Sequence, residues 1–415
     1  MRAQVRVCDS QPPRARNLGC KKMSAPHFKF VANSKYLDKS EAQEAMMDAI
    51  EETSENGIVV APCGCGKSAV IIEALMKAGT MGLVLCYESQ GVYQMADSIR
   101  ENTTLMDNQL FVYSGKGNNT PDERFCYFVT TYGMFSATCA HRSGRSKAVR
   151  DFVLRTKWDL VCCDEFHHAC APTYRPLIED LVQTSTRVLG FTATLFRSEC
   201  NSSKDISALH EARAFGWFGR VLFRRRCREL EKVGLIAKIR RAVVHVELTA
   251  EFARAHVMAK GAQNIYIAAL NPAKLNALKA ICTRHSAMGH VGIVFSNHLL
   301  VAKVAKRCLG DGWAVLSGGA AHGEDDKHTP ERNAEIVRRF NAGKLDGMIC
   351  TAVGESSMDV NVQSFCYVVL LDGDGGVASA AQRLGRVARS KRICSEEGES
   401  DAQLAQRRIA HQKCA

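Results

Sequence analysis

Short apolar runs of three to six residues alternate along this chain with longer segments of helical period. This alternation is the feature that most constrains the fold, because a strand of a parallel sheet is buried on both faces and a helix crosses back to the next strand. The first series of runs predicts buried strands at Ile58 to Ala61, Leu83 to Tyr87, Phe125 to Thr130, Leu160 to Cys163 and Val188 to Thr192.

A second series of the same kind follows nearer the C-terminus. It predicts strands at Gly292 to Phe295, Ala314 to Leu316, Gly347 to Cys350 and Tyr367 to Leu371, with helices around Leu299 to Cys308 and Glu331 to Phe340. At 415 residues and 46% hydrophobic content, the chain is long and apolar enough to bury more than one core. We therefore expect an α/β protein with two tandem domains, each a mainly parallel sheet flanked by helices.

Basic residues exceed acidic ones, 55 against 43, which gives a formal net charge of +12. Such an excess suits a polyanionic partner such as nucleic acid, although a basic protein without such a partner has the same composition. The 18 cysteines lie mostly inside apolar runs, so we expect reduced thiols in the core. No stretch of 18 consecutive apolar residues occurs, and we expect no membrane span and no membrane partner.

Residues 60–70 read VAPCGCGKSAV and connect an expected strand to an expected helix. A turn with glycines before a helix N-terminus is typical of a phosphate-binding loop, in which a lysine contacts the β- and γ-phosphates and a hydroxyl binds Mg²⁺. Ala61 stands where the strict pattern GxxxxGK[ST] has glycine. The candidate nucleotide-binding residues are Pro62, Cys63, Gly64, Cys65, Gly66, Lys67 and Ser68.

Residues 160–168 read LVCCDEFHH, an apolar strand that ends in two carboxylates. We expect Asp164 to hold Mg²⁺ together with Ser68, and Glu165 to orient and deprotonate the attacking water. An exposed strand end with no bound ion is the alternative. His167 and His168 beside Cys163 and Cys170 also allow a zinc site, which is the weaker hypothesis because no second pair at metal-ligand spacing occurs.

Residues 380–391 read AAQRLGRVARSK and have the pattern of a basic helix. Gln382, Arg386 and Arg389 lie three or four residues apart and share one face. A basic helical face is usually solvated. In a two-domain ATPase, however, arginines of one domain can contact the nucleotide bound to the other and stabilise the charge that develops on the γ-phosphate.

Taken together, these motifs and GFTAT at 190–194 resemble the motif set of the superfamily 2 helicases of the DExH kind. Within them the chain most resembles the XPB/Ssl2 family, the DNA translocase of the transcription and repair factor TFIIH, over residues 36–392. Further matching segments are LVLCYESQ (83–90), TTYGM (130–134), GLIAKI (234–239), NPAKL (271–275), GIVFSN (292–297) and the run from Ile349 to Arg389.

This resemblance implies two RecA-like domains that close on ATP, and it assigns further roles. Gln43 would read the adenine, Arg386 and Arg389 would be the arginine fingers, and His167 would relay the state of the γ-phosphate. The residues implied to couple hydrolysis to movement are Thr192, Ala193 and Thr194, and those implied to sense DNA and nucleotide together are Gly354 and Asp359.

By the same resemblance the chain is expected to be an ATP-dependent DNA translocase or 3′ to 5′ helicase that uses ATP and Mg²⁺. It would act in the nucleus in DNA repair or transcription initiation, with repair or transcription factor subunits as partners; a viral or organellar setting stays open. An RNA-directed DExH motor is one alternative. The other is a weakly active ATP-binding scaffold, which Ala61 and Ser198 favour, since the family has Glu where Ser198 stands.

The expected organisation has five parts. They are a basic tail or targeting signal at 1–35, a first RecA-like domain at 36–232, a connector with a thumb-like helical segment at 233–285, a second RecA-like domain at 286–395 and a tail at 396–415. Because the motor motifs begin so early, we also expect the family's N-terminal damage-recognition region to be absent.

Overall fold

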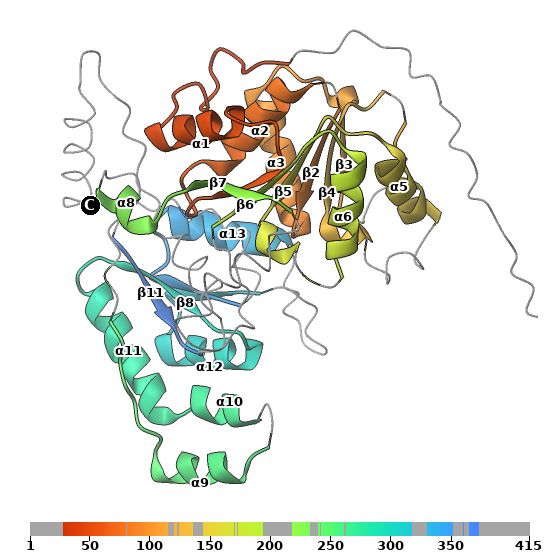
Figure 1. Ribbon diagram of the computed structural model, residues 1–415. Helices are drawn as coiled ribbons and strands as arrows, with labels where there is room; N and C mark the ends of the chain where they lie inside the picture. The colour runs from red at the N-terminus through yellow and green to blue at the C-terminus, as the bar shows by residue number, and fades with distance from the viewer. Residues whose placement is uncertain are drawn as a thin grey trace, which may run out of the picture.

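The computed structural model of the chain describes residues 28–79, 81–114, 120–122, 124–135, 144–169, 171, 173–193, 218–232, 240, 242–260, 263–317, 330–351, 360 and 365–372. Among these residues the chain forms two parallel β-sheets with flanking helices, drawn in the upper and lower parts of Figure 1. The predicted fold class is therefore confirmed. The domain boundaries at 35, 232, 285 and 395 remain predictions.

The first sheet has seven strands in the order β3-β4-β2-β5-β6-β1-β7, and every pairing is parallel. All five strands predicted for this part of the chain are present. Two strands were not predicted, and both lie at the edges of the sheet. The strands are β1 Gly57–Val60, β2 Gly82–Cys86, β3 Leu110–Tyr113, β4 Tyr127–Thr131, β5 Leu160–Asp164, β6 Val188–Thr192 and β7 Arg220–Arg224.

Helices cover both faces of this sheet (Figure 1). Met46 of α1, Ile71 of α2 and Val92 of α3 belong to one apolar cluster, while Val149 of α5 and Ile178 of α6 belong to another. The helices on each face of the sheet therefore pack on a separate hydrophobic core. The helices of this part are α1 Glu41–Glu51, α2 Lys67–Ala78, α3 Ser89–Asn102, α5 Gly144–Arg155, α6 Arg175–Thr184 and α8 Cys227–Lys232.

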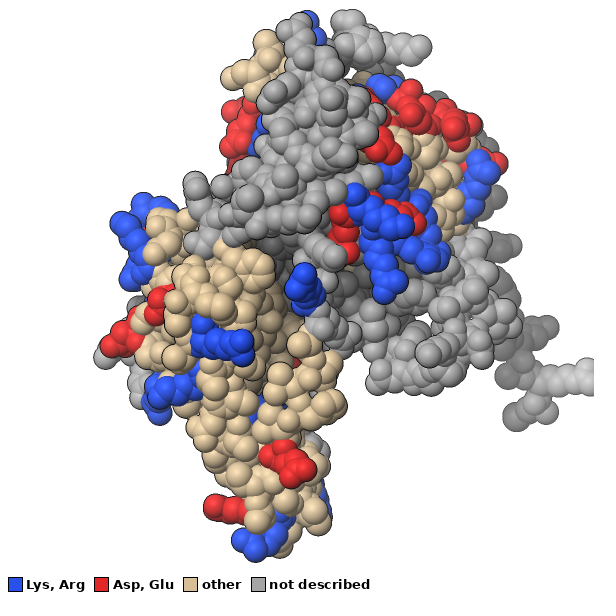
Figure 2. Space-filling model, turned by 90° about the vertical axis from the view of Figure 1, so that its left-hand side faces the viewer, with Lys and Arg blue, Asp and Glu red and all other residues tan. Residues whose placement is uncertain are grey.

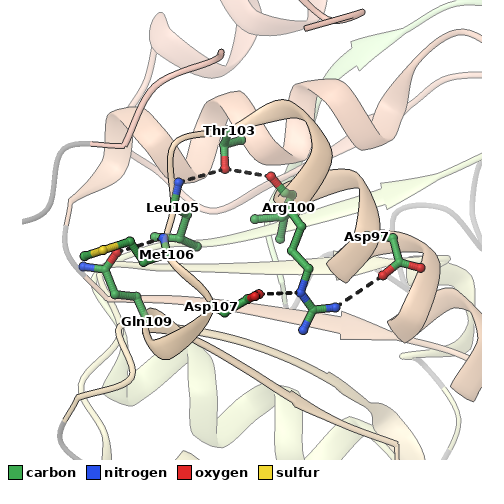
Figure 3. Close-up of polar contacts among 8 residues, drawn as sticks. Asp97, Arg100, Thr103, Leu105, Met106, Asp107 and Gln109 are labelled. Carbon is green, nitrogen blue, oxygen red and sulfur yellow. Dashed lines mark hydrogen bonds and ion pairs between the residues drawn. The ribbon is translucent and has the colours of Figure 1, made fainter.

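An exposed charge cluster closes the connection from α3 to β3 (Figure 3). Arg100 donates from Nε to Asp107 Oδ1 at 2.8 Å and from a terminal nitrogen to Asp97 Oδ1 at 3.3 Å. Thr103 Oγ1 accepts from the amide of Leu105 at 3.3 Å. Because this connection precedes β3, it lies at the N-terminal edge of the sheet, away from the motif-bearing loops.

The second sheet has four parallel strands in the order β11-β8-β10-β9, and all four were predicted. Its two faces carry separate apolar clusters, one containing Val301 of α12 and the other Phe340 of α13. In Figure 1, α9 and α10 lie at the far end of this part, and α9 buries no residue. The elements are β8 Val291–Phe295, β9 Trp313–Leu316, β10 Gly347–Cys350, β11 Cys366–Leu370, α9 Ala250–Met258, α10 Gln263–Ala269, α11 Pro272–Ser286, α12 Leu299–Leu309 and α13 Pro330–Asn341.

The arginine-rich stretch that begins at Arg220 forms an edge strand, β7. Arg225 pairs with Glu41 at 2.6 Å, and Arg220 lies 3.8 Å from Glu55. On the face drawn in Figure 2, the basic side chains of the described residues are interspersed with acidic ones. None of the described helices has the length and apolar character needed to cross a membrane.

Candidate functional site

Three loops that carry predicted motifs leave adjacent strands at the same edge of the first sheet. In the order β5-β6-β1, Val60 pairs with Thr192, and Phe191 pairs with Asp164, so the three strands end level. The amide of Ala61 donates to the carbonyl of Thr192 at 3.0 Å and ties two of the loops together. This edge, at the carboxyl ends of parallel strands, is where α/β sheets bind ligands.

Two glycines give the loop after β1 its shape. Gly64 and Gly66 have φ of 86° and 88°, in the left-handed region that favours glycine. Gly66 is the N-cap of α2 and makes no side-chain cap, which leaves the first amides of the helix available to an anion. A Cβ on Gly66 would lie 2.4 Å from Nε2 of Gln43, so close approach also requires glycine at this position.

Lys67 folds back over this loop. Its Nζ donates to the carbonyls of Ala61 at 3.0 Å and Pro62 at 3.2 Å. Burial alone lowers the pKa of Lys67, but four acidic neighbours outweigh burial and raise the pKa above the usual value. These neighbours are Cys63, Cys65, Glu165 and Asp164. The ammonium is therefore charged at neutral pH, and both carboxylates favour its charged form.

The two loop cysteines differ in exposure. Cys65 is buried, and its Sγ donates to the carbonyl of Pro62 at 2.8 Å. Burial raises the pKa of the Cys65 thiol, so it stays protonated and unreactive at neutral pH. Cys63 is half-buried.

The turn after β5 places the predicted carboxylates in different settings. Asp164 is half-buried; its Oδ1 accepts from the amide of Glu165 at 3.0 Å, and its carbonyl accepts from the Tyr132 hydroxyl at 2.9 Å. Glu165 has φ of 48°, the one positive value of a non-glycine residue among the described residues. Such a conformation is uncommon outside glycine, and it is typical of functional sites.

Glu165 Oε2 is buried and accepts no hydrogen bond. His167 Nδ1 lies 3.5 Å away, which is too far for a good bond. Phe166 is fully buried between these two residues, and a Cβ on Gly190 would lie 2.5 Å from its ring. The glycine of the GFTAT segment therefore provides the space that anchors the acidic turn.

His167 is buried and shares a hydrogen bond of 3.0 Å between its Nδ1 and Thr192 Oγ1. This bond joins the acidic turn to the segment predicted to couple hydrolysis to movement, of which Ala193 is the next, half-buried residue. Cys170, which the zinc hypothesis also needs, lies outside the described residues.

Gln43, which was predicted to read the adenine, lies against the phosphate loop. Its Oε1 accepts from the amide and hydroxyl of Ser40 at 2.9 and 3.0 Å, forming the capping box of α1. Its Nε2 faces Gly66. The side chain therefore has a structural task besides any contact with a base.

An ion pair that sequence reasoning missed holds this segment in place. Lys39 Nζ lies 2.6 Å from Oε1 of Glu73, a buried residue of α2. Glu73 is a charged residue in an otherwise apolar helical stretch, and that anomaly was the available signal.

The residues present fit a nucleotide with Mg²⁺. The loop offers open helix amides and a charged lysine, and the hydroxyl of Ser68 is exposed in the first turn of α2. Asp164 and Ser68 supply the oxygen ligands that Mg²⁺ prefers. Glu165 has an oxygen without a hydrogen bond that can accept a proton. The remaining predicted residues lie outside the described part of the chain: Thr194, Gly354, Asp359, Gln382, Arg386 and Arg389.

Comparison with known families agrees with this geometry. Residues 36–197 match the family described as type III restriction enzyme, res subunit, and residues 230–404 match the ERCC3/RAD25/XPB C-terminal helicase family. In its two parts the chain is therefore similar to the XPB-like superfamily 2 helicases.

Two relatives illustrate the similarity. The helicase/translocase subunit XPB/SSL2 of general transcription and DNA repair factor IIH from Saccharomyces cerevisiae is 27% identical, over 82% of this chain and 38% of the relative. The XPB subunit from Antonospora locustae is 26% identical, over 82% of this chain and 46% of the relative. The chain therefore spans less than half the length of these relatives.

Solved structures share the fold. The structure of Saccharomyces cerevisiae Dbp5 bound to RNA and ADP BeF3 aligns with a TM-score of 0.54 at 14% identity, covering 90% of this chain and 88% of that one. This likeness supports a shared fold of two RecA-like α/β units.

Proposed function

We propose that this XPB-like chain is an ATP-dependent DNA translocase or 3′ to 5′ helicase that acts in DNA repair or transcription initiation. The observation that carries the proposal is the convergence of Lys67, Glu165 and the bonded pair of His167 and Thr192 at one sheet edge. These residues come from three motifs, and in this proposal they supply charge neutralisation, a base and a link to movement.

In the proposed mechanism, Lys67 leaves the carbonyls of Ala61 and Pro62 and neutralises the β- and γ-phosphates. Ser68 and Asp164 would hold Mg²⁺, which supplies further neutralisation of the phosphate charge. Glu165 accepts a proton from the attacking water through its unbonded Oε2.

The arginines of the predicted basic helix complete the site in this proposal. Arg386 and Arg389 would approach from the second domain and stabilise the charge on the γ-phosphate, as fingers do in this class of enzyme. Nucleic acid would bind mainly through its phosphates, so affinity should fall steeply with salt. A nuclear location and partners among repair or transcription factor subunits belong to the same proposal.

The test is ATP hydrolysis measured with Mg²⁺ alone and with single-stranded DNA, double-stranded DNA or RNA, beside a Lys67→Ala control. We expect DNA to stimulate hydrolysis more than RNA does, and EDTA to abolish it. Stimulation by RNA alone would indicate an RNA-directed motor. Nucleotide binding without turnover under every condition would indicate a scaffold.

Polarity needs a separate measurement. Duplexes with a 3′ or a 5′ single-stranded overhang, supplied with ATP, should be unwound or tracked from the 3′ overhang. Equal activity on both substrates would contradict the assigned direction.

A further inference from the structure

Three aromatic rings form a continuous row that begins in the candidate active site. The rings of His167 and His168 lie 4.1 Å apart between centroids at 41°. The His168 ring stacks flat on Tyr87, with 3.5 Å between centroids and 3° between the planes. The row thus joins the turn after β5 to the loop after β2.

The inner end of the row reaches the predicted base. His167 Nδ1 lies 3.0 Å from Thr192 Oγ1 and 3.5 Å from Glu165 Oε2. When Nδ1 carries the ring proton, it donates to one of these two oxygens at a time, so Glu165 and Thr192 compete for that proton. A small displacement of the His167 ring therefore decides whether its Nδ1 bonds to the Glu165 carboxylate or to Thr192.

The outer end of the row reaches the surface. Tyr87 follows the last residue of β2, and β2 pairs with β5 in a register that places Leu85 beside Cys163. Tyr87 therefore lies at the same strand-end edge as Glu165. Its side chain is 39% exposed, so a ligand that runs along this edge can contact it.

We propose that the stacked pair of Tyr87 and His168 couples nucleic acid bound at this edge to the position of Glu165. The inference rests on the proposed function, because it takes nucleic acid to be the ligand of the edge. Tyr87 and His168 are positioning residues in this scheme, since they act through His167 and Glu165 rather than on the nucleotide.

The backbone gives the stack a direct path to the carboxylate. His168 N donates to the carbonyl of Glu165 at 3.0 Å, so the two residues move together. Phe166 is fully buried against Gly190 and anchors the middle of this turn. A shift of the exposed Tyr87 ring therefore turns His168 about a fixed point and alters the strained backbone of Glu165.

The experiment compares wild type with Tyr87→Ala, Tyr87→Leu and Tyr87→Phe at saturating single-stranded DNA. The matched control is Tyr93→Ala, because Tyr93 is a second exposed tyrosine, on α3, whose hydroxyl lies 2.7 Å from Ser114 Oγ. For each protein, kcat and KM for ATP are measured with and without DNA, and thermal unfolding reports the folded state.

We expect the ratio of DNA-stimulated to unstimulated kcat to fall by about tenfold in Tyr87→Ala and Tyr87→Leu, within the usual range of coupling between sites. KM for ATP should stay near the wild-type value. Tyr87→Phe keeps a ring and should keep the ratio, as should Tyr93→Ala. Leucine fills most of the volume of tyrosine, so Tyr87→Leu decides the question if Tyr87→Ala fails to fold.

Three results would overturn the inference. They are an undiminished ratio in Tyr87→Leu, a loss in Tyr87→Phe as large as in Tyr87→Leu, and an equal loss in Tyr93→Ala. If wild-type hydrolysis responds to no nucleic acid, the proposed function fails and the inference fails with it. If DNA stimulates wild type but the ratio of stimulated to unstimulated kcat is unchanged in Tyr87→Leu, only the coupling role of Tyr87 is contradicted and the proposed function stands.

Discussion

The ammonium of Lys39 lies 2.6 Å from the carboxylate of Glu73, and this pair joins the segment before α1 to the helix that follows the phosphate loop. The same carboxylate oxygen is 3.3 Å from Lys77. Because Gln43 is four residues after Lys39 and packs on Gly66, the pair helps to fix the position of the predicted adenine reader against the loop.

Lys39→Met should lower the free energy of unfolding by about 1–3 kcal/mol, since the buried Glu73 loses a charged hydrogen bond. The control is Lys35→Met, because Lys35 lies 3.8 Å from Glu101 and both side chains are exposed. An exposed pair contributes about 0–1 kcal/mol. Urea unfolding measures both variants, and equal losses would show that Glu73 gains nothing from Lys39.

Gln43→Glu separates the two tasks of Gln43. Glutamate preserves the oxygen that accepts from Ser40, so α1 keeps its cap, but it lacks the Nε2 donor. ATP affinity should fall by about tenfold, the value of one hydrogen bond, while α1 stays folded. Affinities for ATP and GTP measured side by side check this. A parallel loss for both nucleotides would argue against adenine reading.

Much of the fold follows from the apolar runs, because a strand buried on both faces has no polar alternation to obscure it. The two strands that escaped prediction are at the sheet edges. β7 at Arg220–Arg224 has an exposed arginine at each end and only three apolar residues between them. β3 at Leu110–Tyr113 is an apolar run of four residues, as long as several runs that were predicted, and it was missed.

The site was predictable to the level of strand ends, since parallel strands bring their C-terminal loops to one edge. The contacts between long or aromatic side chains could not be predicted from the sequence, because they depend on how α1, α2 and the loops pack in three dimensions. Lys39 with Glu73 and Tyr87 with His168 are both of this kind. The contact of Lys67 with its own loop carbonyls is another.

Glu165→Gln should leave ATP bound and stop its cleavage, because the amide keeps the shape of the side chain and cannot take the proton. Lys67→Ala should abolish hydrolysis and weaken binding, since it removes the charge that faces the phosphates. Nucleotide affinity and single-turnover hydrolysis distinguish the two defects. Hydrolysis by Glu165→Gln near the wild-type rate would mean that another group is the base.

His285 predicts a pH dependence of stability. Burial, followed by the charges of His290 and Arg284, lowers its pKa below the ordinary 6.5. Its Nδ1 lies 3.0 Å from Nδ1 of His290, and its ring stacks on Tyr367 at 4.2 Å. The unfolded chain thus binds a proton more readily, and stability present above pH 6.5 is lost as the pH falls.

His285→Asn should therefore reduce the fall in melting temperature between pH 7.5 and pH 5.5, whereas the exposed His245→Asn should leave it unchanged. Melting curves at the two pH values for the three proteins provide the measurement. An identical fall in all three would show that His285 titrates alike in the folded and unfolded chain.

Arg386 and Arg389 test the closure of the two domains. They lie more than 300 residues from Lys67 in the sequence, so they reach the same nucleotide only if the second domain folds over the first. Arg386→Ala and Arg389→Ala should leave nucleotide affinity nearly intact and lower the DNA-stimulated rate by about 10³-fold, the usual scale for an arginine finger. Lysine at either position should restore little activity, because the planar guanidinium fork is lost.

ATP hydrolysis and nucleotide affinity measured together for each arginine variant, with and without DNA, separate catalysis from binding. A scaffold has no need of this closure. Full activity in both variants would therefore contradict the arginine-finger assignment and the domain closure on which the translocase proposal depends.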